Sequence, residues 1–268
     1  DRKEKKEISM RKKLLTLGCL ICAILFGCCC GYIFWYFNSE KEKGEIYEEL
    51  QERAETTPTA APTVTDVPVT EQPEPAEEIP IDFAALQEVN PDIYAWIRIE
   101  GTNIDYPVVQ SSTDDSYYLN HTIEGKEGYP GSIYTESVNS KDFSDFNTIL
   151  YGHNMRDGSM FQNLHNYEES AYMAEHPEVI IYTPDHVYRY QIFAAVTYSD
   201  VHLYHAFDYT TESGRQAFLD SILSSRGMSD TIRDDVPVSA DDKFLTLSTC
   251  IGGQADKRLI VEAVLQSE

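Results

Sequence analysis

The sequence predicts a mainly β domain after residue 80, built as a closed barrel of eight strands. Eight short runs rich in β-branched and aromatic residues are each bounded by Gly, Pro, Asn or Asp, as strands separated by turns are. Many short strands with few helices favour a barrel, because closure leaves no exposed sheet edge. The runs are residues 97–99, 104–109, 132–135, 148–151, 179–182, 187–198, 244–249 and 259–265.

Four helical segments are predicted beside these strands. Residues 83–89 carry apolar side chains at helical spacing, and a turn at Asn90-Pro91 separates them from a second helical piece containing Ile93 and Trp96. The other two helices are predicted near residues 160–167 and from 211 to 226, the latter closed by Gly227 and placed before the last two strands.

The N-terminal part of the chain has the pattern of a membrane anchor. Residues 1–13 are basic, and residues 14–37 form an uncharged apolar run that ends in Trp35 and Tyr36. As a helix this run is about 36 Å long, enough to cross a bilayer core of about 30 Å. A cleavable signal peptide is the alternative, but the run exceeds a usual signal core and no small-x-small site follows it. The excess of basic residues before the run predicts a single-pass protein with a cytoplasmic N-terminus.

A stalk is predicted between the membrane and the barrel, over residues 38–80. Residues 40–55 are charged and predict at most a short solvated helix, and residues 56–80 are rich in Pro, Thr, Ala and Glu. Such a composition favours an extended linker, because it offers too little apolar surface to fold. The predicted domains are therefore a basic tail (1–13), an anchor (14–37), a stalk (38–80) and an extracytoplasmic globular domain (81–268).

Charge and cysteine usage limit the possible functions. The net charge of −24 argues against sequence-independent nucleic-acid binding, which needs an excess of Lys and Arg. Five of the six cysteines lie in the apolar run, so Cys250 stands alone outside it and has no partner for an intrachain disulfide. The sequence shows no convincing cluster of metal ligands, and no cofactor is predicted.

The last two predicted strands form a hairpin that carries a cysteine and an arginine. Cys250 and Arg258 are equally far from Gln254, so a turn centred on Gln254 pairs them across the hairpin. A guanidinium beside a thiol favours the thiolate, which is the nucleophilic form. A buried structural cysteine is the alternative interpretation of Cys250 at this stage.

A thiol nucleophile also needs a partner that exchanges protons, and histidine is the side chain best suited to that role near neutral pH. His153 follows a predicted strand directly, after Gly152, so it projects from a strand end as Cys250 does. The remaining histidines lie in polar loops or helices and are predicted to be solvated surface residues. They are His121, His165, His176, His186, His202 and His205.

These residues resemble the sortase family, most closely class B. The resemblance is carried by Thr-Leu-Ser-Thr-Cys at 246–250, by Tyr-Gly-His-Asn-Met at 151–155, and by Arg258 at the start of the last strand. It covers roughly residues 83–265, and the helix at 211–226 is similar to a class B trait. The fold that it implies is the sortase-type barrel.

The resemblance implies a cysteine transpeptidase that needs no cofactor. Cys250 would attack a threonine carbonyl in a C-terminal sorting motif of LPxTG or NPxTx type, His153 would protonate the leaving amine, and Arg258 would stabilise the oxyanion or position the substrate. A peptidoglycan cross-bridge amine or a pilin lysine, outside a Gram-positive membrane, would then accept the acyl group from the thioester. The residues that the resemblance suggests for substrate binding are Ser248, Asn120 and Ile251.

Several alternatives remain open at the level of the sequence. Anchoring of surface proteins to the cell wall is favoured over class B-like joining of pilin subunits. The run Ile251-Gly252-Gly253 is less polar than expected for class B, which leaves substrate choice open. A secreted cysteine peptidase would use water as the acceptor, and an adhesin or inactive scaffold would have no activity to lose.

Overall fold

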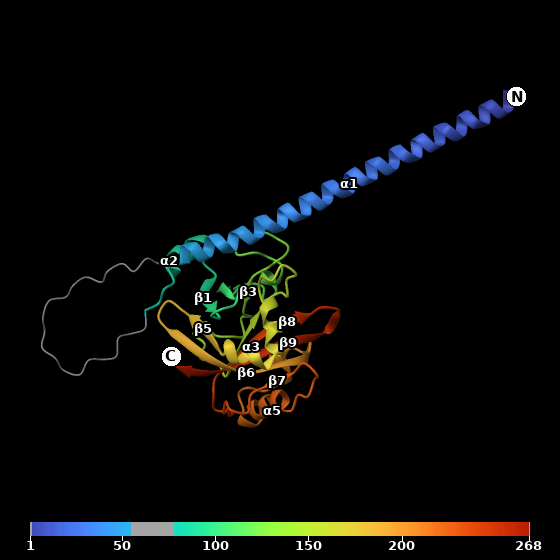
Figure 1. Ribbon diagram of the computed structural model, residues 1–268. Coiled ribbons are helices and arrows are strands. Elements are labelled where there is room, and N and C mark those ends of the chain that lie inside the picture. The colour runs from blue at the N-terminus through green and yellow to red at the C-terminus, as the bar shows by residue number, and fades with distance from the viewer. Residues whose placement is uncertain (1, 55–77, 268) are drawn as a thin grey trace, which may run out of the picture. The chain divides into compact units, whose positions relative to one another are not determined.

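The computed structural model describes residues 2–54 and 78–267, in two compact units that comprise residues 1–46 and 47–268 (Figure 1). The first unit contains the helix α1 (Arg2–Ala54) as far as Ile46. The last turns of α1, from Tyr47 on, belong to the second unit. Within α1 the segment Leu15–Ser39 is long and apolar enough to cross a membrane, with a mean hydropathy of 2.3. Most of the predicted linker, residues 55–77, lies outside the described residues, so the domain boundaries stay predictions.

The second unit contains the predicted closed barrel. Its eight strands are β1 (Ile93–Arg98), β2 (Asp105–Val109), β3 (Ile133–Tyr134), β4 (Asn147–Tyr151), β5 (Glu178–Tyr182), β6 (Val187–Ser199), β8 (Phe244–Ile251) and β9 (Gln254–Ser267). They are bonded in the order β5-β1-β2-β3-β4-β8-β9-β6, and β6 pairs with β5 to close the ring. The pairs β2–β3 and β4–β8 are parallel and the others in the ring are antiparallel. A further short strand, β7 (Thr231–Ile232), pairs with β6 outside the ring.

β1 begins where the sequence predicted a helical piece containing Ile93 and Trp96, and that prediction is wrong. The apolar run is too short for its periodicity to separate a helix from a buried strand. Pairing partners from elsewhere in the chain decide the structure instead, since Trp96 has Pro107 of β2 on one side and Tyr182 of β5 on the other.

The predicted helix at residues 83–89 is confirmed as α2 (Phe83–Val89), where the Asp82 carboxylate accepts a hydrogen bond of 2.9 Å from the backbone N–H of Ala85. The helix predicted near residues 160–167 is a 3-10 helix followed by a short α-helix. The other helices are η1 (Tyr117–Leu119), η2 (Gln162–Glu168), α3 (Ser170–Glu175), α4 (Leu203–Ala206) and α5 (Glu212–Leu223).

α5 is the long helix predicted before the last two strands. It begins where the Thr211 hydroxyl accepts a hydrogen bond from Gly214 N–H at 3.1 Å. It ends at Leu223, earlier than predicted, and Ser224 follows it as the C-terminal cap. The expectation that Gly227 closes the helix is therefore wrong, and Gly227 instead donates its N–H to the Asp230 carboxylate at 2.6 Å.

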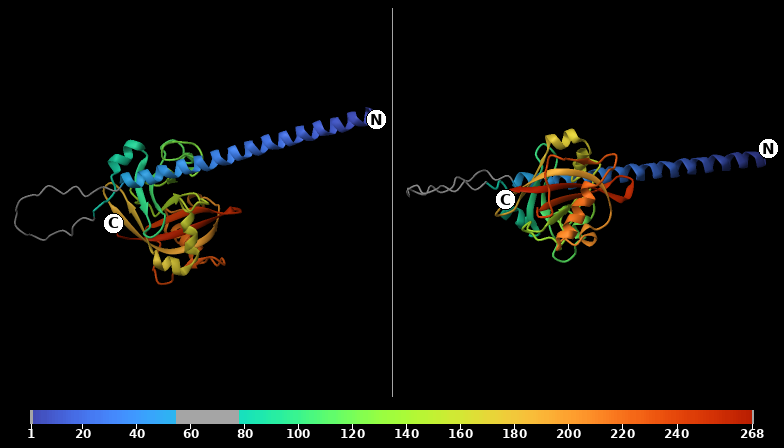
Figure 2. Two further views of the ribbon diagram at one scale, coloured as in Figure 1. Left: turned by 45° about the horizontal axis from the view of Figure 1, so that its top comes forward. Right: turned by 90° about the horizontal axis from the view of Figure 1, so that it is seen from below.

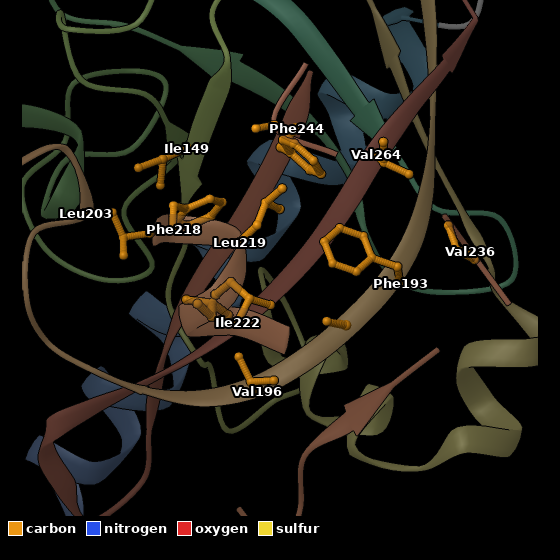
Figure 3. Packing of buried hydrophobic residues seen from close by; sticks show 13 residues of the cluster. Ile149, Phe193, Val196, Leu203, Phe218, Leu219, Ile222, Val236, Phe244 and Val264 are labelled. Atoms are coloured by element: carbon orange, nitrogen blue, oxygen red, sulfur yellow. The ribbon is translucent and has the colours of Figure 1, made fainter. Parts of the chain in front are cut away.

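α5, drawn in orange in Figure 2, covers one outer face of the barrel through a hydrophobic cluster, called the α5 cluster below. Figure 3 shows its apolar face among the strand residues, with Phe218, Leu219 and Ile222 of α5 close to Phe193 of β6 and Phe244 of β8. Each such side chain contributes about 1.5–3 kcal/mol when it is fully removed from water. The cluster therefore fixes the α4–α5 region against β4, β6, β8 and β9.

The last turns of α1 also belong to the second unit. Tyr47, Leu50 and Ala54 are buried, the Tyr47 hydroxyl donates a hydrogen bond to the backbone oxygen of Gly131, and the Gln51 amide donates to the backbone oxygen of Asp105 at 2.7 Å. The prediction of a solvated helix over residues 40–55 is therefore wrong for residues 47–54. The apolar side chains on one face of this part of α1 are buried by strands and loops that lie far away in the sequence.

A fully buried carboxyl group, that of Glu262, lies between β8 and β9. Glu262 is opposite Thr246, whose hydroxyl is within 3.0 Å of both Glu262 carboxyl oxygens and 2.9 Å from Asn147 Oδ1. Burial raises the pKa of Glu262 from 4.5 to about 8. Because the single hydroxyl hydrogen of Thr246 can serve only one acceptor, a proton on Glu262 satisfies all three groups.

Glu262→Gln is expected to flatten the dependence of thermal stability on pH. The raised pKa of Glu262 means that the folded protein keeps a proton that the unfolded chain has released between pH 4.5 and about 8. The stabilisation is complete below pH 4.5, decreases as the pH rises, and is lost above about pH 8. Unfolding midpoints measured from pH 5 to 9 should therefore fall less in Glu262→Gln than in the wild type. Equal slopes would contradict this, and the exposed Glu175→Gln is the matched control.

Candidate active site

The parallel pair β4–β8 brings the predicted histidine and cysteine to the same end of the barrel. Tyr151, the last residue of β4, is the register partner of Ser248 in β8. His153 and Cys250 each follow this pair by two residues, so both lie at the same end of the barrel. Both line one pocket of about 230 Å³.

The hairpin between β8 and β9 places the arginine beside the cysteine, as predicted. Cys250 and Arg258 are direct register partners, and both line the pocket. The predicted centre of the turn at Gln254 is wrong, because Ile251 pairs with Gln254 around a tight turn at Gly252-Gly253. Gly253 has φ +77°, which favours glycine. A register shift between Cys250 and Ile251 takes up the extra residues of β9, so the predicted pair survives the wrong turn.

The floor of the pocket continues the hydrophobic cluster under α5. Ile149, Tyr151, Leu203 and Ile260 belong to the cluster or pack against it, and they also line the pocket. Burial raises the pKa of the Tyr151 phenol, so this lining side chain is neutral. The helix α5 thus supports the wall on which the candidate side chains lie, although it does not itself reach the pocket.

Contacts of the imidazole indicate which nitrogen of His153 is free to exchange a proton. His153 Nε2 is 2.6 Å from the backbone oxygen of Leu119, and the ring packs edge-on against Tyr129 with 4.9 Å between ring centroids. A carbonyl oxygen only accepts hydrogen bonds, so Nε2 carries a hydrogen. Nδ1 is therefore the nitrogen that is left for chemistry.

The guanidinium of Arg258 keeps donors for a ligand. Nη1 donates to the backbone oxygens of Ala255 at 3.0 Å and Lys257 at 2.8 Å, which holds the side chain along the hairpin. Over the described ranges 2–54 and 78–267, the hydrogen bonds of this guanidinium are made by Nη1 alone. The N–H groups of Nε and Nη2 remain able to bind an anionic oxygen.

Comparison with known proteins identifies the family. The model of the family described as "Sortase domain" matches residues 97–266, which include His153, Cys250 and Arg258.

The chain belongs to the sortase family.

Its relatives place this sortase in class B. Sortase B of Listeria monocytogenes is 33% identical over 173 residues, which cover 65% of this chain and 68% of that protein. Sortase B of Staphylococcus aureus is 32% identical over 189 residues, covering 70% and 75%. The crystal structure of sortase B from B. anthracis matches with a TM-score of 0.70 and 29% identity over 87% of this chain and 100% of that chain. A Staphylococcus aureus sortase B–substrate complex matches with a TM-score of 0.67 and 28% identity over 85% and 98%.

As a class B sortase, the protein is a cysteine transpeptidase that cleaves sorting motifs of surface proteins. The sortase family and the eight-stranded barrel predicted from the sequence are therefore confirmed. The alternatives of a cysteine peptidase and of an inactive scaffold are not supported by these relatives.

Of the three residues suggested for substrate binding, only Ser248 lines the pocket. Ser248 is buried and lines the pocket beside Cys250. Asn120 follows η1 and is exposed; its neighbour Leu119 lines the pocket, whereas Asn120 and Ile251 are not among the lining residues. The roles of all three residues stay predictions.

Two histidines that were predicted to be solvated surface residues are partly buried, one in the pocket and one against the backbone of Cys250, and that prediction is wrong for both. His202 lines the pocket with Nε2 2.6 Å from Glu136 Oε2, and its Nδ1 is buried without a hydrogen-bond partner in the described parts of the chain. His165 contacts the backbone oxygen of Cys250 at 3.1 Å. Their partners are 66 and 85 residues away in the sequence, so local patterns carried no signal for them.

Proposed function

We propose that Cys250 is the nucleophile of this sortase, His153 its acid and base, and Arg258 its oxyanion donor. The observation that carries the proposal is that β8, β9 and the segment after β4 bring these three side chains to one pocket. Cys250 is exposed, so a peptide has access to it. It is also the only thiol of the sequence after residue 30.

In the first half of the reaction His153 Nδ1 takes the proton of the Cys250 thiol, and the thiolate sulfur attacks the carbonyl carbon of the threonine in the sorting motif. The Nε and Nη2 donors of Arg258 bind the oxyanion that forms, an electrostatic role suited to a permanently charged fork. The scissile C–N bond then breaks, His153 Nδ1 gives its proton to the leaving amine, and a thioester remains on Cys250.

In the second half an amine replaces the enzyme on the acyl group. His153 Nδ1 takes a proton from the acceptor amine, whose nitrogen attacks the thioester carbon. The C–S bond breaks, the thiolate of Cys250 is restored and a new amide forms. No nucleotide is consumed, because the thioester conserves the energy of the cleaved peptide bond.

A polar pair on the pocket wall supports a sorting motif of NPxTx type over LPxTG. Glu136 and His202 lie in a pocket whose other lining includes Leu119, Ile149 and Ile260. A buried Nδ1 without a partner is costly unless a ligand or water bonds to it. An asparagine amide has both a donor and an acceptor for such a pair, and a leucine side chain has neither.

The acceptor and the membrane anchor complete the proposal. A peptidoglycan cross-bridge amine is favoured as acceptor, and joining of pilin subunits is the same chemistry with a pilin lysine. The apolar segment Leu15–Ser39 supports a single-pass anchor, and the basic residues before it support a cytoplasmic N-terminus with the barrel outside. An anchored enzyme meets membrane-retained substrates at a raised effective concentration.

A peptide panel with intact-mass analysis of the products tests this function. Peptides that differ only in the first motif residue, Asn or Leu, are incubated with the protein alone, with an oligoglycine amine and with a lysine side-chain amine. We expect ligated product whenever an accepted amine is present, faster release of the leaving peptide with that amine, and faster turnover of the Asn peptide. More ligated product with the oligoglycine amine would indicate wall anchoring, and more with the lysine side-chain amine would indicate pilin joining.

Hydrolysed product alone, released at the same rate with and without every amine, would identify a peptidase and contradict the proposal. Equal turnover of the Asn and Leu peptides would show that the Glu136–His202 pair does not recognise the first residue of the motif. The Cys250→Ala variant is the control for uncatalysed cleavage.

A further inference from the structure

The backbone oxygen of Cys250 lies beside two side chains that no part of the proposed reaction uses. Asn154 Nδ2 is 3.0 Å from this oxygen and His165 Nε2 is 3.1 Å from it. Asn154 directly follows His153, and His165 lies in η2. The segment that carries the acid and base is thereby tied to the residue that carries the thiol.

A carboxylate completes the arrangement from the far side of the imidazole. His165 Nδ1 is 3.1 Å from Glu168 Oε1, and the two side chains are 20% and 29% exposed. A carboxylate accepts hydrogen bonds, so Nδ1 carries a hydrogen. This contact fixes the orientation of the ring, as a carboxylate does for a histidine that binds through its other nitrogen.

The hydrogens of this cluster can be assigned consistently. With the hydrogen on Nδ1, Nε2 of the neutral His165 ring accepts a hydrogen bond from Asn154 Nδ2, which lies 2.9 Å away. The second amide hydrogen of Asn154 is then donated to the Cys250 oxygen. The result is a directed chain of hydrogen bonds from Asn154 to Cys250 on one side and through His165 to Glu168 on the other.

Strand pairing alone does not fix the backbone at this point. Cys250 is the last residue of β8 in regular register with β9, and the shift follows immediately at Ile251. Because the peptide group is planar, holding the Cys250 oxygen also fixes the N–H of Ile251, which points in the opposite direction. The hydrogen bond to the Cys250 oxygen therefore limits rotation about the Cα–C bond of Cys250, and this Cα carries the thiol side chain.

We propose that Asn154 is a positioning residue that holds the Cys250 backbone at a fixed place relative to His153, and that His165 and Glu168 act through it by fixing the orientation of its amide. The inference rests on the proposed function, because it takes Cys250 as the nucleophile. Misplacement of a reacting group by about 1 Å can cost about 100-fold in rate. Loss of the cluster therefore lowers kcat and leaves KM nearly unchanged, since none of the three residues lines the pocket.

The test compares His165→Ala, His165→Gln and the exposed control His186→Ala in the full chain, with kcat, KM and the unfolding midpoint measured for each. We expect kcat to fall about 10- to 100-fold in His165→Ala, with KM within about twofold. His165→Gln keeps an amide oxygen that can accept the hydrogen bond from Asn154 Nδ2 and should recover a large part of kcat. His186→Ala should match the wild type.

A second pair of variants keeps the test valid if His165→Ala does not fold. Glu168→Gln still offers an oxygen to His165 Nδ1 and should retain most of kcat, whereas Glu168→Ala should lose a large part of it. A kcat of His165→Ala within twofold of the wild type, or a His165→Gln variant as slow as His165→Ala, would overturn the inference. If Cys250→Ala is inactive in the same assay, such a result rejects only the positioning role; an active Cys250→Ala rejects the proposed function itself.

Discussion

Cys250→Ala is expected to reduce both cleavage and transfer of a sorting-motif peptide to the uncatalysed background. Loss of a covalent nucleophile removes the path through the acyl-enzyme, and comparable deletions cost on the order of 10⁶-fold in kcat. Every other cysteine of the chain lies between residues 19 and 30, in the apolar part of α1, so no second thiol lines the pocket. Product formation measured by intact mass over long incubations checks the prediction.

The fold of this variant should be intact, because Cys250 is exposed and its contacts with Asn154 and His165 are made by its backbone oxygen. Exposed substitutions of this kind usually change stability by less than about 0.5 kcal/mol. An unfolding midpoint equal to that of the wild type therefore serves as the control. Cleavage by Cys250→Ala above background would exclude the thiol as the nucleophile.

His153→Ala is expected to have the second largest effect, a loss of about 10²- to 10⁴-fold in kcat, because proton transfer to the leaving amine is removed. The alanine variant also loses the hydrogen bond to Leu119 and the packing against Tyr129. His153→Gln separates these contributions, since its amide can still donate to the Leu119 oxygen but cannot exchange a proton. Steady-state kinetics of both variants check the prediction.

Both variants should be similarly inactive if His153 acts as acid and base. A His153→Gln variant with more than about a tenth of wild-type kcat would show that the hydrogen bond to Leu119, and not proton transfer, is the main contribution of His153. In that case the acid would have to be sought elsewhere in the pocket, where His202 is the other imidazole.

The strands and the pairing of Cys250 with Arg258 could be predicted from the sequence because their signals are local. A hairpin leaves its mark in a few adjacent residues, and Cys250 opposite Arg258 depends on little more than the length of the connection. The pairing of Cys250 with Arg258 was predicted correctly although the turn was misplaced, because the register shift next to Cys250 takes up the residues between the real turn and Arg258. The family resemblance supplied His153, which lies far from Cys250 in the sequence.

The features that could not be predicted are those that depend on distant partners. Trp96 was assigned to a helix because its strand partners lie in β2 and β5. Burial of Tyr47 requires the loop at Gly131, and the environment of His165 is set by the backbone of Cys250. In each case the local pattern was neutral, and tertiary contacts that the sequence does not reveal determined the outcome.

The central claim is that the reaction passes through a thioester on Cys250, and intact-mass spectrometry of the protein during turnover tests it most directly. A sorting-motif peptide is added without an acceptor amine, the mixture is acidified at short times, and the modified residue is located by digestion. The mass of the protein should increase by the acyl part of the peptide, on Cys250 only, and the added mass should disappear when an amine is supplied. Product formation by the wild type without any adduct on Cys250, or with the adduct on another residue, would contradict the account.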